Sequence, residues 1–303
     1  MDFDVVVVGG GFAGHAAALQ LGRARRRVLL VDAGRPRNRF AGSSHGFLGL
    51  DGASPQRIRR TFLGQLEAYQ TVSHRAGEVI GASTVDTGFR MELGDGEPVL
   101  ARAVILAGGV RDHLPDLPGL KERWGASVLH CPYCHGYELN EAPVGVLGDG
   151  PMAFHQSMIV RDWGPTTLFT QGALQLTAEQ RTALKHRDIA IESTPVTELL
   201  GDGAELHGAK LTDGRLCQIS GLYIAAKTQV VGGLAGDLGC DFEEGPTGKF
   251  IAVDDRQLTS VAGVFAAGDA AAPMANATLS AAAGVRAGTS AHAMLVFDRN
   301  GAA

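Results

Sequence analysis

The chain carries twice a pattern in which a short apolar strand runs into a glycine turn and then into a helix of small residues. The first copy is Asp4-Val-Val-Val-Val-Gly-Gly-Gly-Phe-Ala-Gly-His-Ala-Ala-Ala, and Gly9, Gly11 and Gly14 within it form G-x-G-x-x-G. The first glycine permits a tight turn, the second lets the backbone approach a pyrophosphate, and the third lets the helix pack on the strand. The pattern therefore predicts a phosphate site at the N-terminus of the helix.

A second predicted strand indicates which kind of ligand this turn would hold. Val28-Leu-Leu-Val runs directly into Asp32. The acid lies close to the offset of ~20 residues at which a carboxylate accepts the hydroxyls of a ribose. The N-terminal segment therefore predicts a Rossmann-type site for an adenine dinucleotide.

The second copy of the pattern begins at Val144, where Gly148, Gly150 and Ala153 form G-x-G-x-x-A. Its next strand is Thr167-Leu-Phe-Thr. The chain therefore contains an internal repeat of a dinucleotide-binding unit. We expect an α/β fold with two Rossmann-like (three-layer ββα) dinucleotide-binding domains, the second inserted in the first.

Segments rich in glycine and proline indicate where one predicted domain ends and the next begins. Residues 79–106 alternate in the manner of strands around a turn at Gly94-Asp-Gly-Glu. The segments Leu114-Pro-Asp-Leu-Pro-Gly119 and Glu243-Glu-Gly-Pro-Thr-Gly248 disfavour regular structure and read as linkers. A late strand that ends in Gly268-Asp269 places a carboxylate at the ligand-binding edge of a sheet. We predict that residues 1–117 and 246–303 form the first domain and that residues 118–245 form the second.

Length and charge narrow the class of protein. A chain of 303 residues has room for two domains, and its 42 glycines suit many tight strand-to-helix turns. The net charge is about -5 with both signs spread along the chain, which does not favour nucleic acid or an anionic membrane as a partner. The apolar run Val5–Val8 is too short for a signal peptide or a membrane span. We therefore expect a cytoplasmic protein.

The stretch Cys131-Pro-Tyr-Cys-His-Gly136 holds two of the four cysteines. Covalent haem attachment fits the letters C-x-x-C-H, but that chemistry needs export, which no signal supports. Zinc needs four ligands, which His130, Cys131, Cys134 and His135 could supply together. A redox pair is the favoured interpretation, because a disulfide across so short a loop gains little chain entropy and exchanges easily. Pro132 would keep Cys131 extended and stiffen the pair.

Five motifs in one order resemble those of the low-molecular-weight thioredoxin reductase-type flavoproteins, which are FAD-dependent disulfide oxidoreductases. They are G-x-G-x-x-G at 9–14, Asp32, Ala107-Gly108-Gly109 at a strand end, C-x-x-C at 131–134 and Gly-Val-Phe-Ala-Ala-Gly-Asp at 263–269. The resemblance implies a discontinuous FAD domain that encloses a smaller pyridine-nucleotide domain with the redox cysteines. Cys131-Pro-Tyr-Cys-His-Gly-Tyr-Glu and Ser44-His-Gly-Phe-Leu-Gly further resemble the dithiol oxidases that close disulfides in gliotoxin- and holomycin-like metabolites.

The resemblance also implies the site residues. Cys131 would face the substrate and Cys134 would lie nearer the flavin. Apart from the resemblance, we expect His135 to move protons, with Glu138 as a secondary candidate. The residues that would bind FAD are Gly9, Gly11, Phe12, Ala13, Gly14, Asp32, Asn38, His45, Ala107, Gly108, Gly268, Asp269, Ala277 and Thr278. No resident metal is expected.

Two departures from the reductase pattern bear on function. NADPH-dependent members carry arginines after the second dinucleotide strand, whereas this chain has Thr170-Gln171-Gly172, and no acid for an NADH ribose stands there either. The use of NADPH is therefore left open. Reductases also place an aspartate where this chain has His135, and an imidazole can release or hold a proton near neutral pH. Such a group suits the removal of protons from an incoming dithiol.

We therefore expect an FAD enzyme that oxidises a small-molecule or peptide dithiol to a disulfide, with oxygen as acceptor. One alternative is a thioredoxin-disulfide reductase fed by NADPH or another electron donor, with a thioredoxin-like protein as partner. Another is a flavin-based redox sensor that does not turn over. Relatives of this type imply a homodimer.

Overall fold

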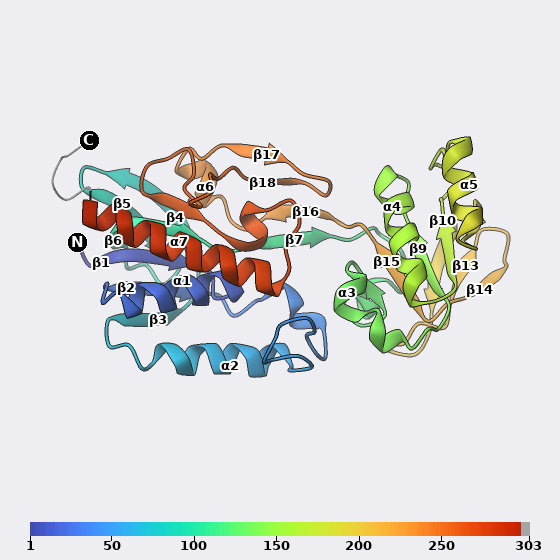
Figure 1. The fold of residues 1–303 in the computed structure, drawn as a ribbon, viewed down its shortest axis with the longest axis horizontal. Helices are drawn as coiled ribbons and strands as arrows, with labels where there is room; N and C mark the ends of the chain where they lie inside the picture. Colours follow the sequence, from blue (N-terminus) through green and yellow to red (C-terminus); the bar gives the residue numbers. More distant parts are fainter. Residues whose placement is uncertain (298–303) are drawn as a thin grey trace. The chain divides into compact units, whose positions relative to one another are not determined.

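The computed structural model describes residues 1–297 and groups them into two compact units. The first unit contains Met1–Arg37, Pro55–Arg111 and the segment that begins at Thr228. The second contains Asn38–Ser54 and Asp112–Lys227. The chain therefore leaves the first unit twice before it returns for its last segment. The longer departure, residues 112–227, can be followed in Figure 1.

The first unit is built on a seven-stranded sheet in the order β3-β2-β1-β6-β5-β4, with β19 paired to β6. Strands β1, β2, β3, β6 and β19 are parallel, whereas β4, β5 and the start of β6 form an antiparallel meander. The strands are β1 (Phe3–Val8), β2 (Val28–Asp32), β3 (Val72–Ala76), β4 (Val79–Val85), β5 (Gly88–Leu93), β6 (Val99–Leu106) and β19 (Val264–Ala266).

Both faces of this sheet are covered, which explains the unbroken apolar run of β1. Val5 and Val7 are fully buried on the face covered by α1 (Phe12–Arg23) and α7 (Ala277–Phe297). Val6 is fully buried on the other face, in a core that includes Leu234 and Ile251. The remaining elements of this unit are α2 (Pro55–Leu66), α6 (Leu234–Asp237), β17 (Phe242–Glu244) and β18 (Lys249–Ile251).

The second unit repeats the design with a five-stranded parallel sheet in the order β11-β10-β9-β15-β8. A small antiparallel sheet, β12-β13-β14, packs its apolar residues into the same unit. Its elements are β8 (Val128–Leu129), α3 (Pro132–His135), β9 (Val144–Leu147), α4 (Pro151–Val160), β10 (Thr166–Phe169), α5 (Ala178–His186), β11 (Ala190–Glu192), β12 (Val196–Leu200), β13 (Gly208–Leu211), β14 (Leu216–Gln218) and β15 (Gly221–Ile224).

The predicted α/β fold with one Rossmann-like unit inserted in another is confirmed. Both glycine turns connect a buried strand to a helix, at β1–α1 and at β9–α4. The last strand, β19, returns to the sheet of the first unit as expected.

The grouping by contacts differs in three places from the predicted boundaries at 117/118 and 245/246. Its breaks fall within β7 (Val110–His113) and β16 (Lys227–Val230), which pair with each other. Residues 228–245 join the first unit because Leu234, Ala235, Leu238 and Cys240 are buried in its core. The loop Asn38–Ser54 groups with the second unit, although it follows β2 of the first. Which unit holds which nucleotide stays a prediction.

Within residues 1–297, no helix combines the length and apolarity that crossing a bilayer would need.

Candidate functional site

The first glycine turn has the shape that a pyrophosphate needs. Gly9 has φ +102°, and a Cβ there would collide with the carbonyl oxygen of Ala107. A Cβ on Gly14 would collide with the carbonyl oxygen of Gly9, so only glycine lets α1 approach β1 this closely. Gly11, the N-cap of α1, is different: its Cβ direction meets no atom within 4 Å. The turn is therefore tight where it packs and open in front of the helix N-terminus, which suits a phosphate group.

Asp32 lies at the end of β2 beside this turn, as predicted. One carboxylate oxygen accepts hydrogen bonds from Gly10 N (3.2 Å) and Gly34 N (3.1 Å). The other accepts from Arg59, whose Nε and Nη2 both lie 2.9 Å away. Burial by itself would raise the pKa of Asp32, but these hydrogen bonds and the Arg59 charge lower it overall. Asp32 is therefore a carboxylate with its acceptor sites in use, and a ribose hydroxyl would share it with Arg59.

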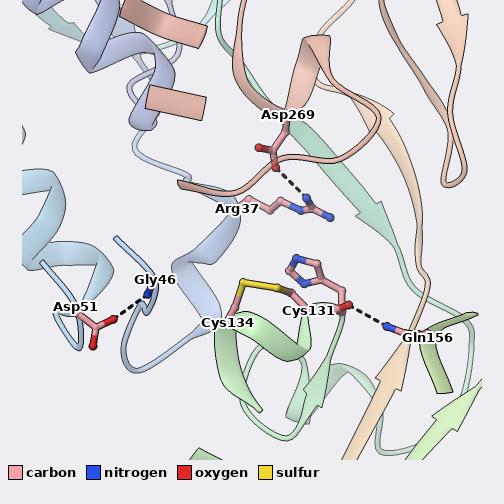
Figure 2. The surroundings of a disulfide bond; sticks show 8 residues. Arg37, Gly46, Asp51, Cys131, Cys134, Gln156 and Asp269 are labelled. Atoms are coloured by element: carbon pink, nitrogen blue, oxygen red, sulfur yellow. Dashed lines mark hydrogen bonds and ion pairs between the residues drawn. A yellow bond between two sulfur atoms is a disulfide. The ribbon is translucent and has the colours of Figure 1, made fainter. Parts of the chain in front are cut away.

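Asp269 lies in the turn after β19, near the start of α7. Its Oδ2 accepts a hydrogen bond from Arg37 Nη1 over 2.8 Å (Figure 2). Its Oδ1 accepts one from Ser280 Oγ over 3.2 Å. Gly268 takes a left-handed φ of +77° that directs the chain into this turn. The predicted residues Ala277 and Thr278 are the first two residues of α7. The first unit therefore presents an open glycine turn and two strand-end carboxylates, an arrangement that fits FAD.

Two predicted FAD ligands, Asn38 and His45, lie in the loop that groups with the second unit. Asn38 Nδ2 donates to Ser44 Oγ over 2.8 Å, so this side chain closes the loop on itself. His45 Nε2 lies 3.3 Å from Glu138 Oε1, and its Nδ1 lies 3.6 Å from Asp51 Oδ2. The structure thus brings together two predicted site residues, His45 and Glu138, that lie far apart in the sequence.

Cys131 and Cys134 form a disulfide, with their Cα atoms 5.4 Å apart (Figure 2). Cys131 is the N-cap of the short helix α3 and has an extended backbone, as predicted from Pro132 at the first helical position. Gln156 Nε2 donates to the carbonyl oxygen of His130 over 2.9 Å and so holds the start of the motif. Tyr133, between the cysteines, is 73% exposed and meets Trp163 edge-on at 5.2 Å.

His135 ends α3, directly after Cys134, and is partly buried. Burial lowers its pKa, the Glu138 charge opposes that change, and His45 adds to it. The net pKa is below its ordinary value, so the imidazole is neutral at pH 7 and can accept a proton. Residues 1–297 contain no group of three or more His, Cys, Asp or Glu side chains arranged to hold a metal ion.

The second glycine turn differs from the first in its chemistry. Asp149 places an exposed carboxylate between the two glycines. Pro151 is the first residue of α4, so one of the N–H groups that would bind a phosphate is missing. Just after β10, Gln171 Oε1 accepts a hydrogen bond from Val196 N over 2.8 Å, and Gln171 Nε2 donates one to the carbonyl oxygen of Val196 over 3.5 Å. The position where arginines or an acid would select a nucleotide is thus used for internal packing.

Comparisons with known proteins agree with this geometry. The family described as pyridine nucleotide-disulphide oxidoreductase matches residues 3–289. The chain belongs to this family. It is 33% identical to thioredoxin reductase tcpT of Claviceps purpurea, over 98% of this chain and 96% of the relative. Family membership implies an FAD site and confirms the predicted resemblance to thioredoxin reductase-like flavoproteins.

Two solved structures extend this family likeness to three dimensions. An oxidoreductase from Agrobacterium tumefaciens is 43% identical and superimposes with a TM-score of 0.93, covering 98% of this chain and 99% of its own. The crystal structure of HlmI is 39% identical with a TM-score of 0.90, covering 97% of this chain and 92% of its own.

Sequence reasoning missed Arg37 and Arg59 of this flavoprotein. Arg37 had a weak signal, since Arg35-Pro-Arg37 follows the end of β2 and precedes the predicted ligand Asn38. Arg59 had none, because its partner Asp32 lies on another element. The two arginines contact carboxylates that the sequence predicted at strand ends. Asp32 ends β2 as predicted, whereas Asp269 lies in the short helical turn Gly268–Ala271, three residues beyond the end of β19.

Proposed function

We propose that this flavoprotein oxidises a small-molecule or peptide dithiol to a disulfide through Cys131 and Cys134, with oxygen as the terminal acceptor. The altered second glycine turn is the observation that supports electron flow from the thiol to the flavin. Asp149, Pro151 and the engaged Gln171 side chain all disfavour a bound NADPH. Without that donor, electrons enter from the thiol substrate. The resemblance to the gliotoxin- and holomycin-type dithiol oxidases supports the same direction.

The cysteine pair performs the thiol chemistry. A substrate thiolate attacks Cys131, the bond between the two cysteine sulfurs breaks, and Cys134 leaves as a thiolate. The second substrate thiolate then attacks the substrate sulfur bonded to Cys131, which releases the product disulfide and the reduced pair. The substrate loses two electrons and two protons in this exchange. FAD, when bound, supplies the two-electron acceptor for the reduced pair.

The neutral His135 supplies the base. Its lowered pKa keeps it unprotonated at pH 7, so it can accept a proton from an entering thiol. A thiolate is the reactive nucleophile, so this transfer precedes attack on the disulfide. The exposed Tyr133 beside the pair offers an aromatic face to an apolar substrate.

The test compares electron donors anaerobically. Purified holoprotein is mixed with dithiothreitol or NADPH while the flavin absorbance is followed, and air is then admitted. Rapid bleaching by the dithiol, recovery in air and formation of peroxide are expected. Bleaching by NADPH at a turnover rate would instead show a reductase.

One comparison favours the reductase as the second candidate, since tcpT is named a thioredoxin reductase. Oxidised thioredoxin added to the NADPH reaction distinguishes this candidate. Slow bleaching by dithiol with no turnover would favour a redox sensor. The homodimer and the cytoplasmic location stay predictions.

A further inference from the structure

His45 stands between two carboxylates of different exposure. Its Nε2 faces Glu138 Oε1 at 3.3 Å and its Nδ1 faces Asp51 Oδ2 at 3.6 Å. The side chain of His45 is 21% exposed, that of Glu138 is 42% exposed and that of Asp51 is 66% exposed. Ser43 Oγ lies 2.9 Å from Nε2. The two ring nitrogens thus face two exposed carboxylates, Glu138 in the turn after the cysteine motif and Asp51, which is the more exposed of the two.

The loop that carries His45 is held in place by its own hydrogen bonds. Ser44 N donates to the carbonyl oxygen of Ala53, and Gly52 N donates back to that of Ser44, both over 2.9 Å. Gly46 N donates to Asp51 Oδ1 over 2.8 Å (Figure 2). This hydrogen bond holds the carboxylate that faces His45 Nδ1. His45 and Asp51 therefore keep their separation without help from a ligand.

Glu138 links this loop to the redox motif. It lies three residues after His135, in the turn that continues α3, and both belong to the same compact unit as the loop. The Glu138 charge raises the pKa of His135, against the effect of burial. The groups that face His45 are thus Ser43, Asp51 and Glu138, and the His45 charge also lowers the pKa of His135.

We propose that His45 is a positioning and relay residue that carries protons released at the cysteine motif from Glu138 to Asp51 and the solvent. This inference rests on the proposed dithiol oxidation, which sheds two protons per substrate. An imidazole can bind a proton at Nε2 while it releases one from Nδ1, so each transfer leaves the ring unchanged in charge. No electron moves in this step. A small rotation or a water molecule would close the 3.6 Å separation to Asp51.

The experiment measures the pH profile of flavin bleaching by dithiothreitol in anaerobic stopped flow. His45→Ala is expected to lower the rate about tenfold or more at pH 6–7, within the range of general acid–base effects. Added imidazole should restore much of that rate, because the small base can occupy the vacated place. His45→Gln keeps a hydrogen-bonding side chain but cannot titrate, and it should be as slow as His45→Ala.

His207 offers a matched control in the same unit. Its two ring nitrogens also face carboxylates, Asp202 at 4.0 Å and Glu205 at 3.9 Å, but on the loop between β12 and β13. His207→Ala should leave both the rate and the pH profile unchanged, with no response to imidazole.

The outcomes separate the two proposals. If dithiothreitol does not bleach the unmodified holoprotein, the proposed function fails before any variant is made. If it does, and His45→Gln keeps the normal rate and pH profile, the relay is wrong while the oxidase stands. Should His45→Ala fail to fold by circular dichroism, His45→Gln and Asp51→Asn decide: normal profiles in both overturn the relay, and shifted profiles support it.

Discussion

Arg37 Nη1 donates to Asp269 Oδ2 over 2.8 Å, which joins two residues 232 positions apart in the chain. One follows the second strand of the first unit and the other follows its last strand. Both side chains are about three-quarters buried, at 26% and 23% exposed, so the ion pair is more than a surface contact. It places a guanidinium beside a carboxylate that we predict to bind FAD.

Replacing Arg37 with leucine should weaken FAD binding. The change removes the charged partner of Asp269 and leaves only the hydrogen bond from Ser280, and a hydrogen bond to a charged group is worth about 1.5–3 kcal/mol. We expect a loss in FAD affinity of about tenfold or more, measured by fluorescence titration of the apoprotein. Arg35→Leu is the control, because Arg35 is 60% exposed and pairs with Glu78 instead. Equal affinity in both variants would remove Arg37 from the site.

The glycines of the first turn should separate folding from binding. Gly11 has an extended backbone that any residue adopts, and its Cβ direction is open, so Gly11→Ala should keep the melting temperature. The added methyl group would occupy the phosphate position and lower FAD affinity about tenfold or more, since one such group at a ligand is worth about 1–3 kcal/mol. Gly14→Ala should instead destabilise the fold by about 1–3 kcal/mol, because its Cβ collides with Gly9.

Those two variants are compared by thermal melting of the apoprotein and by FAD titration. A Gly11→Ala protein that binds FAD normally would show that the phosphates lie elsewhere.

Serine at Cys134 should abolish bleaching by dithiothreitol while FAD stays bound, because the disulfide that accepts the thiolate no longer exists. Cys217→Ser is the control, since Cys217 is a free cysteine outside the motif and burial raises the pKa of its thiol. Flavin content and bleaching rate are read from the absorbance spectrum. A normal rate in Cys134→Ser would disprove the redox assignment.

The pKa of His135 predicts a pH dependence of stability. Burial lowers the folded-state pKa of His135 below the ordinary 6.5. At pH values between the folded-state pKa and 6.5, the unfolded chain therefore binds more protons than the folded one. The contribution of His135 to stability is therefore present above pH 6.5 and is lost as the pH falls through the folded pKa. His135→Asn should flatten this part of the curve of unfolding free energy against pH, measured by urea denaturation. An unchanged slope would contradict the burial effect.

The charge on Glu138 makes a second, opposite contribution to the same group. It raises the pKa of His135 against the effect of burial. Glu138→Gln should therefore lower that pKa further, as followed by NMR of labelled histidine. A rise would show that the two side chains are not coupled in this way.

Much of the fold was predictable because its signals are local. The run Val5–Val8 before Gly9 predicts a buried strand, and β1 is one, buried on both faces. The repeat at Gly148 predicts a second strand-to-helix turn, which β9 and α4 confirm. The boundary between the units was harder to predict from the sequence. It lies near residue 228 because Leu234 and Cys240 are buried in the core of the first unit, and no residue pattern near 228 indicates that burial.

By itself, the sequence determined the two glycine turns, the strand-end carboxylates Asp32 and Asp269, and the adjacent cysteine pair, because each depends on backbone sterics and spacing within a few residues. Only the tertiary structure decided which side chains face those groups. Arg37 meets Asp269, Arg59 meets Asp32 and His45 meets Glu138 across long stretches of chain. Such pairs depend on how sheets and loops pack, and no local pattern of residue types records that packing.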